Sequence, residues 1–280
     1  MIIKDTILAV LSDMHTGGST ALFPAGGYTG KGAEDNHIAP NKRQQQIHPI
    51  FTRFGAEVGI ARKNKRLIVV MLGDAIDGFH HGSLQESLFN VKDQCAAHVT
   101  LMKDWMKRAK FGKGDELYYV RGTEAHVGDN ENDMAMELGS IKSPSGLHVF
   151  ETLTLDINGS RHMFFHHGTT RGKGQNEGNA LRNYLRDFRS ELEKDALDSV
   201  DALWTGHTHG PTWNTHISRR KDGQFHVLHG FICPSFQGKT RYAYGKVPAT
   251  VNSVGGVYTR VTVDGEIQCP HFVVQVMKDE

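Results

Sequence analysis

The strongest constraint on the fold is a set of four short apolar runs, each of which ends in acidic or histidine side chains. The runs have the length and the β-branched content of buried strands, and they cover residues 7–11, 67–72, 116–120 and 200–204. Segments with helical spacing of apolar residues follow the first two runs, over residues 41–61 and 84–109. Strands and helices in this order predict an α/β fold.

The second half of the chain is richer in predicted strands. Residues 151–157 and 161–166 flank Asn158-Gly159, a strong hairpin signal. Residues 175–197 read as a charged amphipathic helix, and residues 212–280 read as a β-rich C-terminal part. No linker divides the sequence, so we expect residues 1–280 to form a single domain. The Gly-rich segment 16–40 carries no period and predicts a long loop insertion, either a lid or a disordered segment.

Composition excludes several classes of protein. The chain has 32 Lys and Arg against 31 Asp and Glu, a net charge of +1, which argues against a dedicated non-specific nucleic-acid binder. Its longest apolar run falls far short of the roughly 20 residues that span a bilayer, and its N-terminus lacks a signal-peptide cleavage pattern. The three cysteines, Cys95, Cys233 and Cys269, are far apart. We therefore expect a cytoplasmic protein with no membrane partner.

The predicted strand ends carry a surplus of metal-binding side chains. Such residues follow the strands at Asp13 and His15, Asp74 and Asp77, Glu124 and His126, His166 and His167, and His207 and His209. Ligands of open α/β sheets bind at the carboxyl ends of strands, so these side chains are expected to converge. Carboxylates with imidazoles and no thiolate suit Mn²⁺, Fe, Zn²⁺ or Mg²⁺. The candidates are too many for one ion and fit two ions that share a carboxylate, as in phosphoester hydrolysis.

The order of the motifs resembles the calcineurin-like metallophosphoesterase superfamily. The matching blocks are Asp13-x-His15, Gly73-Asp74-x-x-Asp77, a turn at Gly122, His167-Gly168 and Gly206-His207-x-His209. The third block departs from the family's Gly-Asn-His-Asp/Glu, because this chain has Gly122-Thr123-Glu124-Ala125-His126, a variant similar to that of phage-associated members. The resemblance implies a four-layer α/β/β/α sandwich of two mixed sheets flanked by helices.

The resemblance also implies roles for individual residues. Asp13, His15, Asp74 and His209 would hold the first metal, and His167 and His207 would join the bridging Asp74 on the second. Glu124 is the better replacement for the family's Asn ligand, because the neutral hydroxyl of Thr123 is a poor ligand for a hard cation. His126 would contact the phosphate or protonate the leaving oxygen, and Arg171 would clamp the phosphate. Strand alternation allows only one of His166 and His167 to point inward, and His167 fits the motif better. Asp77 reads as a supporting or helix-capping carboxylate.

These roles predict a dinuclear hydrolase in which a metal-bridging hydroxide attacks phosphorus in line. Mn²⁺ is the first choice of metal, with Fe, Zn²⁺ and Mg²⁺ as alternatives. The Asp13-x-His15-x-Gly17 opening resembles the superfamily's DNA-repair exonucleases and favours a phosphodiesterase or nuclease acting on DNA or a nucleotide. A phosphomonoesterase, either a protein or a nucleotide phosphatase, is the alternative, and a non-catalytic metal-binding scaffold is the third hypothesis.

Overall fold

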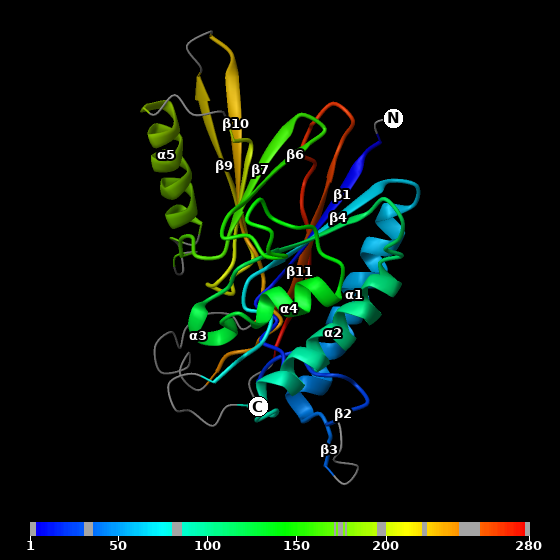
Figure 1. The fold of residues 1–280 in the computed structure, drawn as a ribbon. Helices are drawn as coiled ribbons and strands as arrows, with labels where there is room; N and C mark the ends of the chain where they lie inside the picture. The colour runs from blue at the N-terminus through cyan, green and yellow to red at the C-terminus, as the bar shows by residue number, and fades with distance from the viewer. Residues whose placement is uncertain are drawn as a thin grey trace.

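Two five-stranded sheets lie between two layers of helices (Figure 1). The computed structural model describes residues 4–30, 36–79, 86–170, 172, 176, 178–194, 200–219, 223–240 and 253–277. The first sheet has the strand order β12-β11-β1-β4-β5, and the second has the order β6-β7-β8-β10-β9. Both sheets mix parallel and antiparallel pairs. This is the four-layer α/β/β/α sandwich implied by the resemblance to the calcineurin-like metallophosphoesterases, so that prediction is confirmed.

The elements have the following bounds. The first sheet contains β1 (Thr6–Ser12), β4 (Arg66–Leu72), β5 (Glu116–Val120), β11 (Ser253–Val261) and β12 (His271–Val276). The second contains β6 (Leu153–Ile157), β7 (Ser160–Phe165), β8 (Ala202–Thr205), β9 (Thr212–Arg219) and β10 (Phe225–Ile232). A small hairpin pairs β2 (Tyr28–Thr29) with β3 (His37–Ile38). The helices are α1 (Lys42–Arg62), α2 (Val91–Arg108), α3 (Glu124–Val127), α4 (Asn130–Glu137) and α5 (Asn179–Lys194).

Each pair of neighbouring layers buries its own apolar core. Phe54 of α1 and Trp105 of α2 pack against the outer face of the first sheet. Val70 of the first sheet and Trp204 of the second belong to the core between the two sheets. Leu185 of α5 packs over the outer face of the second sheet. Because the side chains of a strand alternate between its faces, both faces of each sheet are covered, and the strands read as nearly continuous apolar runs.

One prediction about local structure was wrong. The helix expected over residues 84–109 begins at Val91, because the Asn90 side chain caps it by accepting from the backbone N–H of Lys92 at 2.9 Å. Just before that cap, the backbone N–H of Leu88 donates to Gly17 and ties this segment to the loop after β1. Most of the described residues of the segment 16–40 form a loop, as predicted, and this loop is packed: Phe23 is fully buried, and the β2–β3 hairpin lies beyond it.

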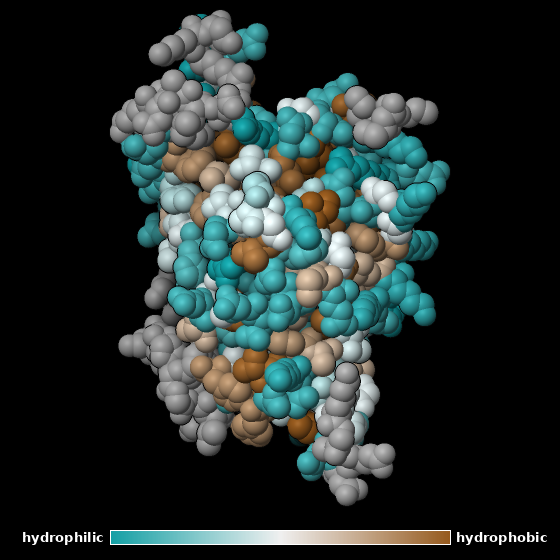
Figure 2. All heavy atoms as spheres, in the orientation of Figure 1, coloured by the Kyte–Doolittle hydropathy of each residue, from teal (hydrophilic) through white to brown (hydrophobic). Residues whose placement is uncertain are grey.

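The surface is predominantly polar on the face shown in Figure 2, with smaller hydrophobic areas between the polar ones. None of the helices in the described part of the chain combines the length and the apolar composition needed to cross a bilayer.

Candidate metal centre

Asp13, directly after β1, lies at the middle of the centre. Its side chain is fully buried, and its Oδ1 lies 2.9 Å from His166 Nε2 and 3.3 Å from His209 Nε2. The backbone N–H of His207 donates to its other carboxylate oxygen at 3.0 Å. One carboxylate of the first sheet therefore contacts three residues that follow strands of the second sheet. The ends of the two sheets meet at this point.

Asp74 follows the neighbouring parallel strand β4 and lies beside Asp13. Its Oδ1 accepts a hydrogen bond from the backbone N–H of Thr123 at 2.6 Å, and its Oδ2 is 3.7 Å from both His15 Nε2 and His166 Nε2. The third block can approach this closely because it begins with Gly122. A Cβ at that position would lie 2.2 Å from the backbone nitrogen of Asp74. The glycine is therefore a steric requirement of the site.

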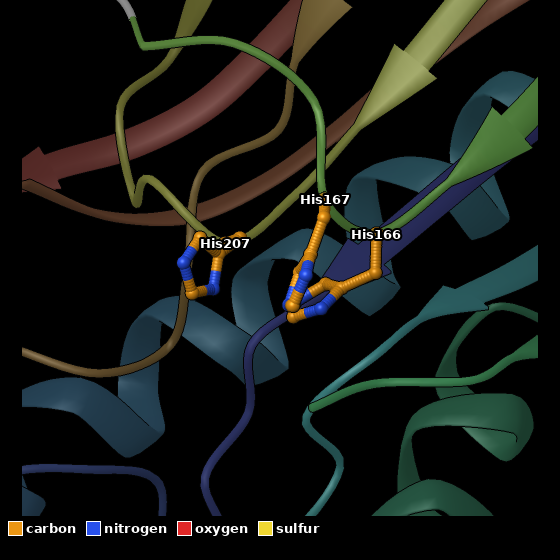
Figure 3. A group of neighbouring side chains, drawn as sticks. All are labelled: His166, His167 and His207. Carbon is orange, nitrogen blue, oxygen red and sulfur yellow. The ribbon is translucent and has the colours of Figure 1, made fainter. Parts of the chain in front are cut away.

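Four histidines reach the centre from the second sheet. The rings of His166 and His167 leave the end of β7 on the same side, and His207 lies opposite them (Figure 3). The ring centroids of His167 and His207 are 4.4 Å apart, and those of His166 and His167 are 5.0 Å apart. The prediction that only one of His166 and His167 points toward the centre was wrong. β7 ends at Phe165, so the alternation of a strand does not extend to residues 166 and 167.

The backbone at the centre adopts conformations that side chains disfavour. Eight non-glycine residues in the described chain have positive φ, and five of them are Asp13, His15, Asp74, His207 and His209. Left-handed backbone at a residue with a Cβ carries a conformational cost, and it persists where the surrounding structure enforces it. The strand ends thus turn sharply and aim these side chains at one point.

The electrostatics of the centre are dominated by buried carboxylates. Burial alone would lower the pKa of His166, but the negative charge of Asp13 and the hydrogen bond between them raise it to about 9. Burial likewise opposes protonation of His15, yet its hydrogen bond to Asp77 and the charge of Asp74 raise its pKa. Burial would raise the pKa of Asp13, and His166 and His209 hold it well below its usual value. The cluster therefore attracts positive charge, which protons or metal cations can supply.

His15 has the arrangement of a metal-binding histidine. Its Nδ1 lies 3.1 Å from Asp77 Oδ1, which also accepts a hydrogen bond from Gln237 Nε2 at 3.2 Å. Its other nitrogen, Nε2, is buried and has no hydrogen-bond partner among the described residues, and the same holds for His166 Nδ1. A carboxylate that orients one ring nitrogen while the other faces acidic oxygens is typical of metal sites. Asp77 accordingly has the supporting position expected for it.

Four overlapping groups of side chains could each hold an ion, since within each group one ligand atom per residue lies within 4.8 Å of the others. The groups are His166, His167 and His207; Asp13, His15 and His209; His15, Asp74 and His126; and Asp13, Asp74 and His166. Imidazole and carboxylate donors in this number fit divalent first-row cations, and Asp74 belongs to two of the groups.

The third block is arranged differently from its sequence interpretation. Thr123 faces the centre, with its Oγ1 3.0 Å from His167 Nε2 and 3.3 Å from Asp74 Oδ2. Glu124, which was expected to replace the family's Asn, begins α3, is exposed and belongs to none of the four groups. His126 does reach the centre: its Nδ1 donates to the backbone carbonyl of Asp77 at 2.7 Å, and its ring lies 4.7 Å from that of His15.

A buried carboxylate, which no sequence motif indicates, supports the loops of the centre. Arg171, expected to clamp phosphate, lies outside the described residues. Glu131 of α4 is fully buried, and the sequence analysis missed it because it follows no strand and matches no motif. Its carboxylate accepts hydrogen bonds from the backbone N–H groups of Gly122, at 2.8 Å, and Ala75, at 3.4 Å. Burial raises the pKa of Glu131 to about 7. It ties together the two loops that carry Asp74 and Thr123.

Comparisons with known proteins give likeness in structure alone. No protein-family model and no curated protein matches the chain. It is similar to a hypothetical protein from Pyrococcus horikoshii OT3, with 8% identity over 98% of this chain and 89% of that one and a TM-score of 0.41. It is also similar to a metallophosphoesterase from Sphaerobacter thermophilus, with 10% identity over 95% of this chain and 87% of that one and a TM-score of 0.34. A third similar structure is a 5'-nucleotidase from Candida albicans SC5314, with 12% identity over 95% of this chain and 49% of that one and a TM-score of 0.35.

Proposed function

We propose that this chain is a dinuclear metal-dependent phosphoesterase that hydrolyses phosphodiesters. The observation that carries the proposal is the convergence of buried carboxylates from the first sheet with histidines from the second, which two of the four overlapping groups combine. Structural polar clusters usually satisfy their buried atoms by hydrogen bonds. Here the buried Nε2 of His15 lies near Asp13 and Asp74 without a hydrogen-bond partner among the described residues, which favours a metal centre.

The ligand set suits Mn²⁺ first, with Fe, Zn²⁺ and Mg²⁺ as alternatives. Asp13, His15 and His209 would hold one ion, and His167 and His207 would hold the other. Asp74, which belongs to two of the four groups, would contact both ions. Divalent cations at such a centre lower the pKa of a bound water and offset the negative charge of the phosphoryl oxygens.

The residues of the third block would handle the substrate. His126 is oriented by donation from Nδ1 to the carbonyl of Asp77, and its imidazole would contact a phosphoryl or leaving oxygen. Thr123 has the position expected of the family's Asn, and its hydroxyl would orient His167 or contact the second ion. Asp77 and Glu131 would act indirectly, by orienting His15 and the two loops.

A diester is the preferred substrate class. His167 and His207 are exposed, so the second-sheet side of the centre is open to a substrate with groups on both sides of the phosphorus. The Asp13-x-His15-x-Gly17 opening supports the same preference. The alternatives, a phosphomonoesterase and a non-catalytic metal-binding scaffold, become outcomes of the experiment.

The experiment compares Mn²⁺-loaded protein on bis-p-nitrophenyl phosphate and p-nitrophenyl phosphate. We expect cleavage of the diester with the higher kcat/KM, its loss in Asp74→Asn and its retention in Asp104→Asn, a matched change on the exposed face of α2. Cleavage of the monoester alone would replace the diesterase with a phosphatase. Cleavage of neither ester with Mn²⁺, Mg²⁺, Zn²⁺ or Fe²⁺ would favour the scaffold.

A further inference from the structure

A cavity of about 500 Å³ opens beside the candidate metal centre, on the outer side of the second sheet. Its lining includes His166 and His167, so the cavity and the centre share two residues. The volume lies in the range of small-molecule sites, which is on the order of 300–1,000 Å³. A molecule whose phosphate is bound at the centre could place the rest of its structure here.

Three of the residues that line the cavity are aromatic. Phe165 of β7 and Tyr184 of α5 have ring centroids 6.4 Å apart, and Phe188 lies one helical turn beyond Tyr184, also at 6.4 Å. All three side chains are partly exposed. They remain accessible because α5 packs mainly over β9 and β10 and leaves the outer face of β7 incompletely covered. Figure 2 shows hydrophobic surface between the places that α5 and the β6–β7 hairpin occupy in Figure 1.

Polar groups also line the cavity. Arg121 donates from Nε to Glu151 at 2.6 Å and from Nη1 to the carbonyl of Gly128 at 3.2 Å, and both Arg121 and Glu151 line the cavity. A guanidinium and a carboxylate side by side offer donors and acceptors to the edge of a heterocycle. The cavity therefore combines flat apolar rings, hydrogen-bonding groups and an end at the candidate metal centre.

We propose that this cavity binds the nucleobase of a nucleotide phosphoester whose phosphate lies at the metal centre. The inference rests on the proposed function and names its substrate class. Aromatic side chains stack on any base, because every base has a π-face. An aliphatic phosphoester would leave these aromatic side chains without a matching surface. The base can belong to a free nucleotide or to a nucleic-acid strand, and the experiment separates the two sources.

The test uses two diesters with the same leaving group, the p-nitrophenyl ester of thymidine 5'-phosphate and methyl p-nitrophenyl phosphate. We expect wild type to prefer the nucleotide, and Phe188→Leu and Tyr184→Ala each to lower the ratio of the two kcat/KM values about 10-fold, the effect of losing one stacking contact. Tyr184→Phe keeps the ring and should keep the ratio, as should Phe225→Leu, a matched change at a residue outside the cavity. An unchanged ratio in Phe188→Leu and Tyr184→Ala overturns the proposal.

Failure of the pocket and failure of the proposed function give different results. Turnover of both diesters with no preference for the nucleotide retains the phosphoesterase and overturns the pocket. If neither diester is cleaved, the proposed function fails. Calorimetric binding of thymidine 5'-monophosphate, weakened about 10-fold in Tyr184→Ala, would then still support the pocket, and absence of binding would overturn it. Stronger competition by a short oligothymidylate than by the mononucleotide would identify a strand as the source of the base.

Discussion

His162 lies within β7 and His166 directly follows this strand, and both are buried, yet their surroundings shift their pKa values in opposite directions. His162 stacks beside Phe164 and Trp204 in the core between the sheets, where burial lowers its pKa to about 3. His166 directly follows the carboxyl end of β7, where the charge of Asp13 overcomes burial and raises its pKa to about 9. Burial alone therefore does not mark a functional histidine. The charge of Asp201 also acts to raise the pKa of His162, but burial outweighs it there.

We expect the largest effect on activity from removing the negative charge of Asp13 beside His166. Asp13→Asn removes the carboxylate that faces both His166 and His209. We expect Mn²⁺-dependent kcat/KM on bis-p-nitrophenyl phosphate to fall on the order of 10³-fold, because a metal ion supplies several kcal/mol of transition-state stabilisation. Activity within tenfold of wild type would show that this carboxylate is not part of the catalytic centre.

The core histidine should make the protein sensitive to acid. The unfolded chain protonates His162 near its ordinary pKa of 6.5, whereas the folded chain resists protonation down to about pH 3. Since the unfolded state then binds more protons, the contribution of His162 to stability is intact above pH 6.5 and is lost as the pH falls. The free energy of unfolding should fall by about 3 kcal/mol between pH 6.5 and 4 for this reason.

Urea unfolding at several pH values measures this effect. His162→Gln keeps an acceptor for Trp204 Nε1, which donates to His162 Nδ1 at 3.1 Å, but it does not titrate. The stability of the variant should therefore decline less steeply with acid than that of wild type. If stability depended on pH in the same way in the two proteins, the lowered pKa of His162 would be contradicted.

A smaller effect is expected from Asp77, which orients His15 without belonging to any of the four ligand groups. Asp77→Asn weakens the acceptor that holds His15 Nδ1. We expect the Kd for Mn²⁺, measured by titration calorimetry, to rise about 10-fold to 100-fold, as is usual for such supporting residues. An unchanged Kd would mean that His15 is held adequately by its packing. Asp104→Asn serves as the control.

The smallest effect should come from Glu131→Gln. An amide has one oxygen, so it can accept well from one of the two backbone N–H groups that the carboxylate now serves. The loops bearing Asp74 and Thr123 would lose part of their alignment. We expect a fall in kcat of about 10-fold with little change in KM. Equal effects of Glu131→Gln on the two parameters would point to a structural role instead.

The sequence predicted most of the fold because the strand signals were local and strong. The predicted bounds of β1, β4 and β5 were nearly correct. Because these strands are parallel neighbours in one sheet, the residues that follow them, Asp13, Asp74 and Thr123, lie at the same end of the sheet. The start of α2 was missed because the preceding segment pairs with the loop after β1, a contact between residues distant in sequence.

The site was less predictable than the fold. Metal-binding residue types at strand ends can be read from a sequence, but the turns that aim them cannot. The early end of β7 admits both His166 and His167, and α3 begins where Glu124 turns outward. Glu131 has no sequence signal, because its importance comes from its burial against two backbone N–H groups of other segments.

Counting the Mn²⁺ ions bound per chain tests the dinuclear centre most directly. The metal-free protein would be titrated with Mn²⁺ by calorimetry at pH 7.5, alongside Asp74→Asn. We expect two bound ions in wild type and a loss of at least one in the variant, because Asp74 is the proposed ligand of both ions. A stoichiometry of one or none in folded wild-type protein, or two ions retained by Asp74→Asn, would contradict it.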